Sequence, residues 1–186
     1  MATHVALLRG INVGGNNKVP MAELRGAVSS LGYSAVSTYI QTGNVLFSTP
    51  ETETAVLETA ISDVIASTFS LKIGVVVVTR DELAAVLSQN PYPDEPNPKF
   101  VHVMFLGAEP DQAQLDRLEA ANEAAAAKGT RDSVTVIGRR LYLHTPDGYG
   151  PSELAQTLSR NTLRVNGTAR NLATTTKLLA LCDAAK

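Results

Sequence analysis

The segment RGINVGGNNKVPM, residues 9–21, combines three glycines, three asparagines and two cations, a composition suited to binding an anion. Glycine-rich loops that lead into a helix leave backbone N–H groups free to donate hydrogen bonds to a phosphate or carboxylate. The segment also exceeds the roughly 2–6 residues that usually join a strand to a helix, and long loops often carry function. A glycine-permitted turn with solvated polar residues is the alternative. The residues expected to contact the anion are Arg9, Asn12, Gly14, Gly15 and Lys18.

Two named phosphate motifs do not fit this segment. A P-loop requires the pattern G-x-x-x-x-G-K-[ST], and Gly10 and Gly15 have its spacing. Asn16 and Asn17, however, stand where the phosphate-binding lysine and the magnesium-binding hydroxyl must be. The dinucleotide fingerprint G-x-G-x-x-G is absent from the segment. The sequence therefore predicts a general anion site and neither of these nucleotide sites.

A second polar segment, YIQTGN at residues 39–44, has the composition of a hairpin turn. Gly43 would supply the positive φ of the turn, and Gln41 or Asn44 would hydrogen-bond its backbone. We expect the strand before this turn to run antiparallel to the strand at residues 4–8, which places the turn far from the opening loop. A strand of this length spans about 17 Å. The two polar loops are therefore not expected to share one small ligand.

The segment TARN, residues 168–171, precedes a run with helical periodicity. Asn171 or Thr168 can cap that helix through its side chain. Arg170 is unexpected there, because the helix dipole favours anions at a helix start. Binding of an anion explains the arginine, and an ion pair on the surface or between domains is the alternative. We expect Arg170 and Asn171 to complete the anion site of the opening loop across the domain boundary.

Other residue types that carry chemistry form no recognisable site. His4, His102 and His144 have no carboxylate or cysteine at metal-ligand spacing, so we expect no metal ion. No G-x-S-x-G pattern marks a nucleophilic serine. The sequence implies no cofactor, and it leaves open whether the protein is an enzyme and which oligomer it forms.

Composition narrows the class of protein. Of the 186 residues, 44% are hydrophobic, which is enough for a buried core in one or two domains. The net charge of −2 excludes a generally basic surface, and the absence of tryptophan weakens any model of base stacking. The single cysteine, Cys182, excludes a disulfide framework and is expected to pack in the core. Without a membrane span or a signal peptide, we expect a cytoplasmic protein with no membrane partner.

The elements that position these residues follow from hydrophobic periodicity. A helix is predicted at residues 20–31, a second one begins near residue 49, and Thr79 and Glu82 form a capping box for a third. Strands are predicted at residues 4–8, 36–40, 44–48 and 73–78. The order β-α-β-β-α-β is the ferredoxin-like, or split βαβ, arrangement. We expect an α+β fold in which this unit and one extra helix form a domain over residues 1–89.

The second half of the sequence repeats much of this order. Four prolines make residues 90–99 unsuitable for a helix or a central strand, so this segment is predicted to be a linker. Beyond it, the predicted strands are residues 101–106, 133–137 and 140–144, and the predicted helices lie around Leu118 and over residues 151–158 and 171–185. The order β-α-β-β-α followed by a helix predicts a smaller α+β domain over residues 100–186.

Several segments together resemble one bacterial family. They are ALLRGINVGGNNKVPM, TYIQTGNVLF, RLYLHTPDGYGPSEL and TARNLATTTKLLAL. The family they resemble is domain-of-unknown-function family 1697. Two positions depart from its common pattern: Leu172 stands in place of tryptophan, and Thr42 in place of serine. The resemblance implies a two-part α+β fold with ferredoxin-like character, and it implies no reaction.

Three hypotheses about function remain. The first is a protein that binds a small phosphorylated or carboxylated ligand at the glycine-rich loop. The second is an RNA-binding module on a ferredoxin-like sheet, although the aromatic residues that stack on bases are not evident. The third is an enzyme that acts on a phosphorylated metabolite, which would require a general base within about 3 Å of the bound ligand.

Overall fold

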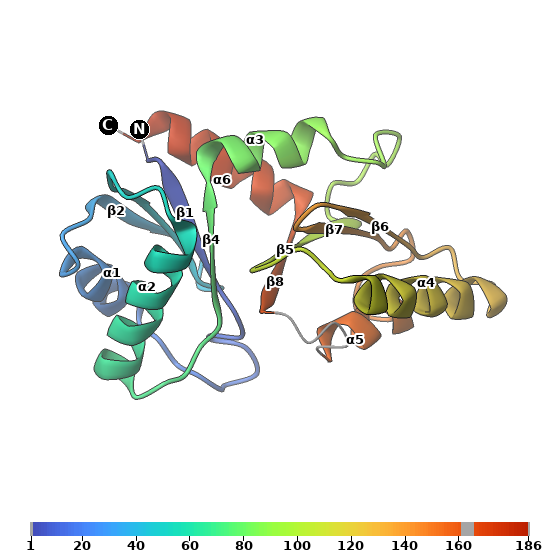
Figure 1. Ribbon diagram of the computed structural model, residues 1–186, viewed down its shortest axis with the longest axis horizontal. Coiled ribbons are helices and arrows are strands. Elements are labelled where there is room, and N and C mark those ends of the chain that lie inside the picture. The colour runs from blue at the N-terminus through green and yellow to red at the C-terminus, as the bar shows by residue number, and fades with distance from the viewer. Residues whose placement is uncertain (1, 161–165, 186) are drawn as a thin grey trace. The chain divides into compact units, whose positions relative to one another are not determined.

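The computed structural model describes residues 2–160 and 166–185, and the chain divides into two compact units (Figure 1). The first unit comprises Met1–Ala85 and Thr176–Lys186, and the second comprises Val86–Thr175. Each unit contains one four-stranded antiparallel sheet, so the predicted α+β class is confirmed. The residues after Thr175 group with the first unit. The predicted domain limits, 1–89 and 100–186 with a linker between them, stay a prediction.

The first unit has the strand order of a ferredoxin-like sheet. Its elements are β1 (His4–Leu8), α1 (Met21–Ser29), β2 (Ser34–Tyr39), β3 (Asn44–Ser48), α2 (Thr54–Phe69) and β4 (Val75–Thr79), and α3 (Arg80–Ser88) follows. The sheet order is β2-β3-β1-β4, and each neighbouring pair is antiparallel. The predicted strand around Leu7 therefore lies inside the sheet, as this fold requires.

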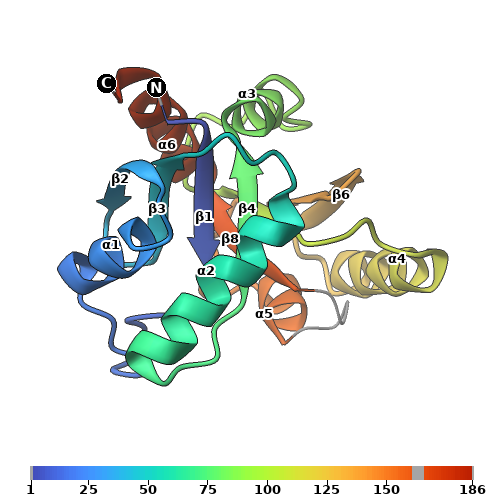
Figure 2. The same ribbon diagram turned by 60° about the vertical axis from the view of Figure 1, so that its left-hand side comes forward.

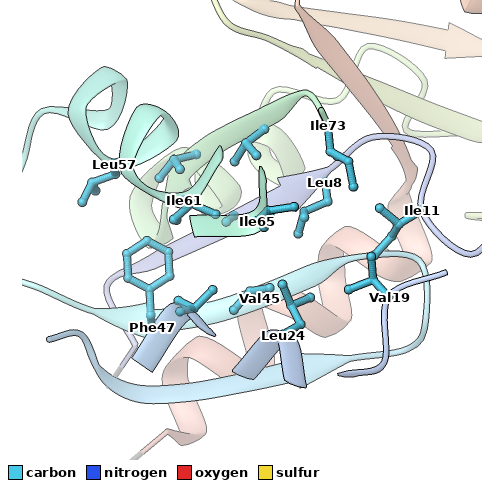
Figure 3. Packing of buried hydrophobic residues seen from close by; sticks show 14 residues of the cluster. Leu8, Ile11, Val19, Leu24, Val45, Phe47, Leu57, Ile61, Ile65 and Ile73 are labelled. Carbon is cyan, nitrogen blue, oxygen red and sulfur yellow. The ribbon is translucent and has the colours of Figure 1, made fainter. Parts of the chain in front are cut away.

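The core of the first unit lies between the sheet and helices α1 and α2, which cover the same face (Figure 2). Leu24 of α1 and Ile61 of α2 pack with Val45 of the sheet (Figure 3). Ile11 and Val19, from the connection between β1 and α1, belong to the same buried cluster. Burying a side chain of this size contributes about 1.5–3 kcal/mol. The opening loop is therefore anchored in the core at both of its ends.

The second unit has the same topology. Its elements are β5 (Val101–Leu106), α4 (Gln112–Ala127), β6 (Ser133–Ile137), β7 (Arg140–His144), α5 (Glu153–Ser159) and β8 (Gly167–Asn171), and α6 (Leu172–Ala184) follows. The sheet order is β6-β7-β5-β8, with all neighbouring pairs antiparallel. Leu118 of α4 and Leu154 of α5 pack against Leu141 and Leu143 on one face of the sheet. Both units thus follow the order β-α-β-β-α-β.

The prediction missed β8, because it assigned TARN only to the start of the last helix. Gly167–Asn171 pairs with β5 at the edge of the second sheet. A Cβ atom on Gly167 would lie only 3.2 Å from the carbonyl oxygen of Phe105, so this close approach favours glycine. The predicted cap is confirmed, since Asn171 Oδ1 accepts a hydrogen bond of 2.8 Å from the Thr174 N–H group.

Two other helices also had predicted starting residues, and one of these predictions is confirmed. α2 begins at Thr54 and not near residue 49, because the Glu51 carboxylate holds the preceding turn by accepting from the N–H groups of Thr52 and Glu53. The predicted capping box at Thr79 is confirmed. Its hydroxyl accepts a bond of 3.1 Å from the Glu82 N–H group, and the Glu82 carboxylate accepts one of 2.8 Å from the Thr79 N–H group.

Candidate functional site

Three connections meet at one end of the first unit's sheet, where β1 and β2 end and β3 and β4 begin. They are residues 9–20, 40–43 and 70–74, and we call them together the glycine end. The predicted separation of the hairpin turn from the opening loop is wrong. β3 lies between β1 and β2 and is antiparallel to both, so β1 and β2 are parallel to each other and end on the same side.

Backbone and side-chain hydrogen bonds join the three connections. The Leu8 N–H group donates to the Gly43 carbonyl oxygen at 2.8 Å, and the Arg9 N–H group donates to the Gly74 carbonyl oxygen at 2.9 Å. Asn12 Nδ2 donates to the Gln41 carbonyl oxygen at 2.9 Å. The opening loop and the hairpin turn can therefore contact the same ligand, contrary to the expectation from the sequence.

The Asn12 side chain organises the opening loop. Its Oδ1 atom accepts a hydrogen bond of 2.9 Å from the Val19 N–H group, and its Nδ2 atom donates to the Val19 carbonyl oxygen at 3.0 Å. With the further bond to Gln41, the Asn12 side-chain amide bonds to the backbone of both the opening loop and the hairpin turn. Asn17 has a similar role, since its Nδ2 atom donates to the Gly10 carbonyl oxygen at 3.0 Å. A direct role of Asn12 in ligand binding stays a prediction.

The tip of the opening loop is a tight turn and not the start of a helix. Val13 and Asn16 form an isolated β-bridge, and the Asn16 N–H group donates to the Val13 carbonyl oxygen at 3.1 Å. Gly14 and Gly15 form the turn between them, with φ values of 60° and 80° that glycine adopts at little cost. α1 begins only at Met21. Gly14 and Gly15 therefore form the tip of the loop, and the residues that follow them lead into α1.

An open hollow of about 450 Å³ lies beside the loop, a volume within the range of small-ligand sites. The predicted residue Lys18 lines it, and its side chain is exposed. The helix start contributes to the wall, and its N-cap residue, Pro20, supplies no capping side chain to the first helical N–H groups. The lining residues are Asn12, Gly15, Lys18, Val19, Pro20, Met21 and Gln41.

The glycine end is positively charged. Its three connections contain Arg9, Lys18 and Lys72 and no aspartate or glutamate. The closest carboxylate in the sequence is Glu23, in the first turn of α1. At the other end of the same sheet, Glu51 and Glu53 lie in the connection before α2, and Asp81 and Glu82 lie in the first turn of α3. The positive charges at the glycine end produce a local electric field that attracts anions, although the net charge of the whole chain is −2.

Arg170 and Asn171 lie in β8 of the second unit. Arg170 is 8% exposed, and its Nη1 atom donates to the Thr168 hydroxyl at 2.9 Å and to the Ala169 carbonyl oxygen at 2.8 Å. Burial lowers the pKa of Arg170 to about 10, which leaves it charged at neutral pH. Both residues thus have local structural contacts, and their part in an anion site stays a prediction.

A second polar cluster lies in the second unit. His144 Nε2 and Glu95 Oε2 are 2.7 Å apart, and the ring of Tyr92 stacks on that of His144. The bond from His144 holds the pKa of Glu95 below its usual value. Tyr92 also shares hydrogen bonds with the hydroxyls of Ser133 and Thr135. Across the described part of the chain, no three His, Cys, Asp or Glu side chains are grouped as a metal ion would require.

Comparison with known proteins places the chain in a family. The family model described as "Protein of unknown function (DUF1697)" matches residues 1–142. The chain belongs to the DUF1697 family. No curated protein matches it. The sequence resemblance to this family is therefore confirmed, and the glycine end lies entirely within the matched part of the DUF1697 chain.

A solved structure shares the fold of this DUF1697 chain. It is the conserved bacterial protein SP0830 from Streptococcus pneumoniae, with a TM-score of 0.71 and 22% sequence identity. The likeness covers 97% of this chain and 98% of that chain. At this identity it shows the fold alone, including the β8–α6 region beyond the family match. In the part of the DUF1697 chain that the structure describes, no helix has both the length and the apolar character needed to cross a membrane.

Proposed function

We propose that this protein binds a small ligand bearing a phosphate or carboxylate group at the glycine end. The observation that carries the proposal is the charge of the glycine end: its three connections contain three cations and no carboxylate, and Lys18 among these cations lines the hollow. A charged hydrogen bond from Lys18 and backbone N–H groups of the loop would hold the anion. The uncapped first turn of α1 adds a favourable dipole.

The competing hypotheses have less support. Ferredoxin-like domains that bind RNA stack bases on aromatic residues of the sheet face without helices. In the first sheet, Val5, Leu7 and Val76 of that face are at most 1% exposed, and the aromatic residue on it is Tyr39, which is half-buried and lies in register with Leu7 through Asn44. In the second sheet the aromatic residues Phe105 and Tyr142 are at most 3% exposed. Catalysis would require a general base, and the three connections of the glycine end contain no histidine, aspartate or glutamate.

Titration with inorganic phosphate and with phosphorylated and carboxylated metabolites tests the proposal. Amide NMR shifts of the wild-type protein should change first at Gly14–Lys18 and at the start of α1. Lys18→Gln should weaken phosphate binding about 10-fold, since a charged hydrogen bond contributes roughly 1.5 kcal/mol or more.

Lys99→Gln is the matched control, because Lys99 is an exposed lysine of the second unit. The control should bind phosphate as the wild type does. Equal binding by both variants, or shifts confined to other regions, would contradict the proposed site. Arg170→Lys in the same titration tests the prediction that Arg170 contributes to the anion site.

A further inference from the structure

Two exposed hydrophobic side chains lie on the glycine end. Of the large hydrophobic residues described by the structure, three are strongly exposed: Val13 at 60%, Val56 at 54% and Ile40 at 47%. Val13 lies at the tip of the opening loop and Ile40 at the start of the hairpin turn. Neither residue lines the hollow, so a ligand that fills the hollow alone leaves both in water. Contiguous exposed apolar surface marks interaction sites, and the segments of Val13 and Ile40 are joined by the hydrogen bond from Asn12 to Gln41.

Backbone and loop contacts fix where these two residues lie on the chain's surface. Val13 is fixed by its bridge with Asn16, and the hydrogen bond from Asn12 to Gln41 connects the loop to the residue that follows Ile40. Ile40 has a φ of 50°, in the left-handed region that disfavours β-branched residues. Strain of this kind persists where the surrounding structure over-determines the conformation, and it clusters at functional sites. Asparagine would adopt the same backbone conformation at a lower cost in free energy. We therefore attribute the isoleucine at this position to a contact that its side chain makes.

Cations, apolar side chains and a hollow together define the chemistry of the partner. Lys18 favours acidic groups, whereas Val13, Ile40 and the apolar wall formed by Pro20 favour aliphatic or aromatic ones. A ligand confined to the hollow contacts neither Val13 nor Ile40, whereas a peptide segment that extends past the hollow has further side chains with which to cover them. Charge complementarity at such a surface gives specificity and rapid association.

We infer that the glycine end docks an acidic, amphipathic peptide segment of a partner protein. An acidic side chain of that segment occupies the hollow near Lys18, and its apolar side chains cover Val13 and Ile40. The inference rests on the proposed function, because the same anion site receives the acidic group, and it adds the class of molecule that carries this group.

A phage-displayed library of random dodecapeptides, selected on the immobilised full-length protein, tests the inference. Enriched peptides should combine aspartate or glutamate with aliphatic or aromatic residues. A synthetic enriched peptide should bind the double variant Val13→Ser/Ile40→Asn at least 10-fold more weakly than the wild type, and its binding should weaken as salt is raised. Ile40→Asn alone should raise Tm while it weakens peptide binding, a combination that a loss of folding cannot produce.

Val56→Ser is the matched control, because Val56 is a comparably exposed aliphatic residue in the first turn of α2, at the other end of the unit. It should leave peptide affinity unchanged. If no peptide is enriched, or if enriched peptides bind the double variant as well as the wild type, the inference is overturned. Binding to phosphatidylserine vesicles that depends on Val13 and Ile40, without peptide enrichment, would also overturn it in favour of a lipid surface.

The same set of measurements separates this inference from the proposed function. Phosphate binding that depends on Lys18, together with failure of the peptide selection, removes the inference and leaves the small-ligand proposal intact. Peptide binding that depends on Val13 and Ile40, together with no phosphate binding, supports the docking surface and removes the small-ligand proposal.

Discussion

His102 shows how burial decides the charge of a single residue. Its ring lies in β5, tilted against the ring of Tyr149 at a centroid distance of 4.2 Å. Its buried Nδ1 atom has no hydrogen-bond partner among the described residues. Burial lowers the pKa of His102 to about 4, from 6.5 for an exposed histidine. Because the unfolded chain takes up this proton more readily, the free energy of unfolding falls as the pH is lowered from 6.5 toward 4.

We expect His102→Phe to remove this pH dependence. Phenylalanine keeps a ring beside Tyr149 and leaves no unpaired nitrogen, so the variant should be as stable as the wild type at pH 7, or more stable by about 1–2 kcal/mol. The difference should grow as the pH is lowered through the window from 6.5 to 4. Urea unfolding at several pH values measures it. A difference that stays constant with pH would show that His102 does not titrate in this way.

At the residue scale, the sequence identified the charge of the site better than its shape. Lys18 and Gly15 were predicted from composition, and both line the hollow. Met21 and Gln41 also line it and were missed, because their position depends on how the loop, the helix and the hairpin turn meet. Asn12 was predicted as a ligand residue, yet its amide is bonded to Val19 and Gln41. An asparagine that binds a ligand and one that binds backbone look the same in a sequence.

The hairpin turn packs tightly against the end of β1. Gly43 has a φ of 83°, and a Cβ atom at this position would lie 2.7 Å from Leu8 Cβ and 2.9 Å from Ile11 Cδ1. Glycine is therefore required both for the backbone conformation and for the close approach. This contact, together with the hydrogen bond from Leu8, fixes the turn beside the opening loop.

Gly43→Ala should destabilise the protein by about 2–4 kcal/mol, since a left-handed backbone and an overpacked contact both add to the cost. Gly26→Ala is the matched control. Gly26 lies within α1 and nothing comes within 4 Å of an added Cβ atom, so alanine should stabilise the protein by about 0.5–1 kcal/mol. Chemical unfolding of the two variants measures both effects. A loss of only a few tenths of a kcal/mol for Gly43→Ala would mean that the turn moves away from β1 easily.

At the element scale, periodicity predicted strands and helices well and their relations less well. The ferredoxin-like order of the first unit was evident from its apolar segments, and the first sheet confirms it, whereas the second sheet contains one strand more than was predicted. β8 was missed because its sequence, GTARN, has no apolar alternation and is assigned to a strand only by its pairing with β5. The position of the hairpin turn was wrong because β1 and β2 were taken as antiparallel, although the split βαβ arrangement inserts β3 between them and makes them parallel. Whether two strands are parallel depends on which strand lies between them, and this is a property of the whole sheet.

Two helices contain the points at which the chain passes from one compact unit to the other. The division between the units falls within α3, after Ala85, and within α6, after Thr175. Residues 90–99 belong to the second unit, where Tyr92 and Glu95 both contact His144. These contacts give the segment a defined position although it has no regular secondary structure.

Limited proteolysis tests whether the proline-rich segment is a linker. The sequence predicts that a protease of broad specificity cleaves preferentially within residues 90–99, whereas the contacts of Glu95 predict slow cleavage there in the wild type. Glu95→Ala removes both the bond with His144 and the bond that the Glu95 carboxylate accepts from the Asn97 N–H group. Cleavage of this variant should therefore be several times faster.

Asp94→Ala is the control, because it changes an exposed neighbouring carboxylate, and the protease should cleave this variant at the wild-type rate. Rapid cleavage of all three proteins would establish a free linker, and equal, slow cleavage would show that Glu95 does not hold the segment.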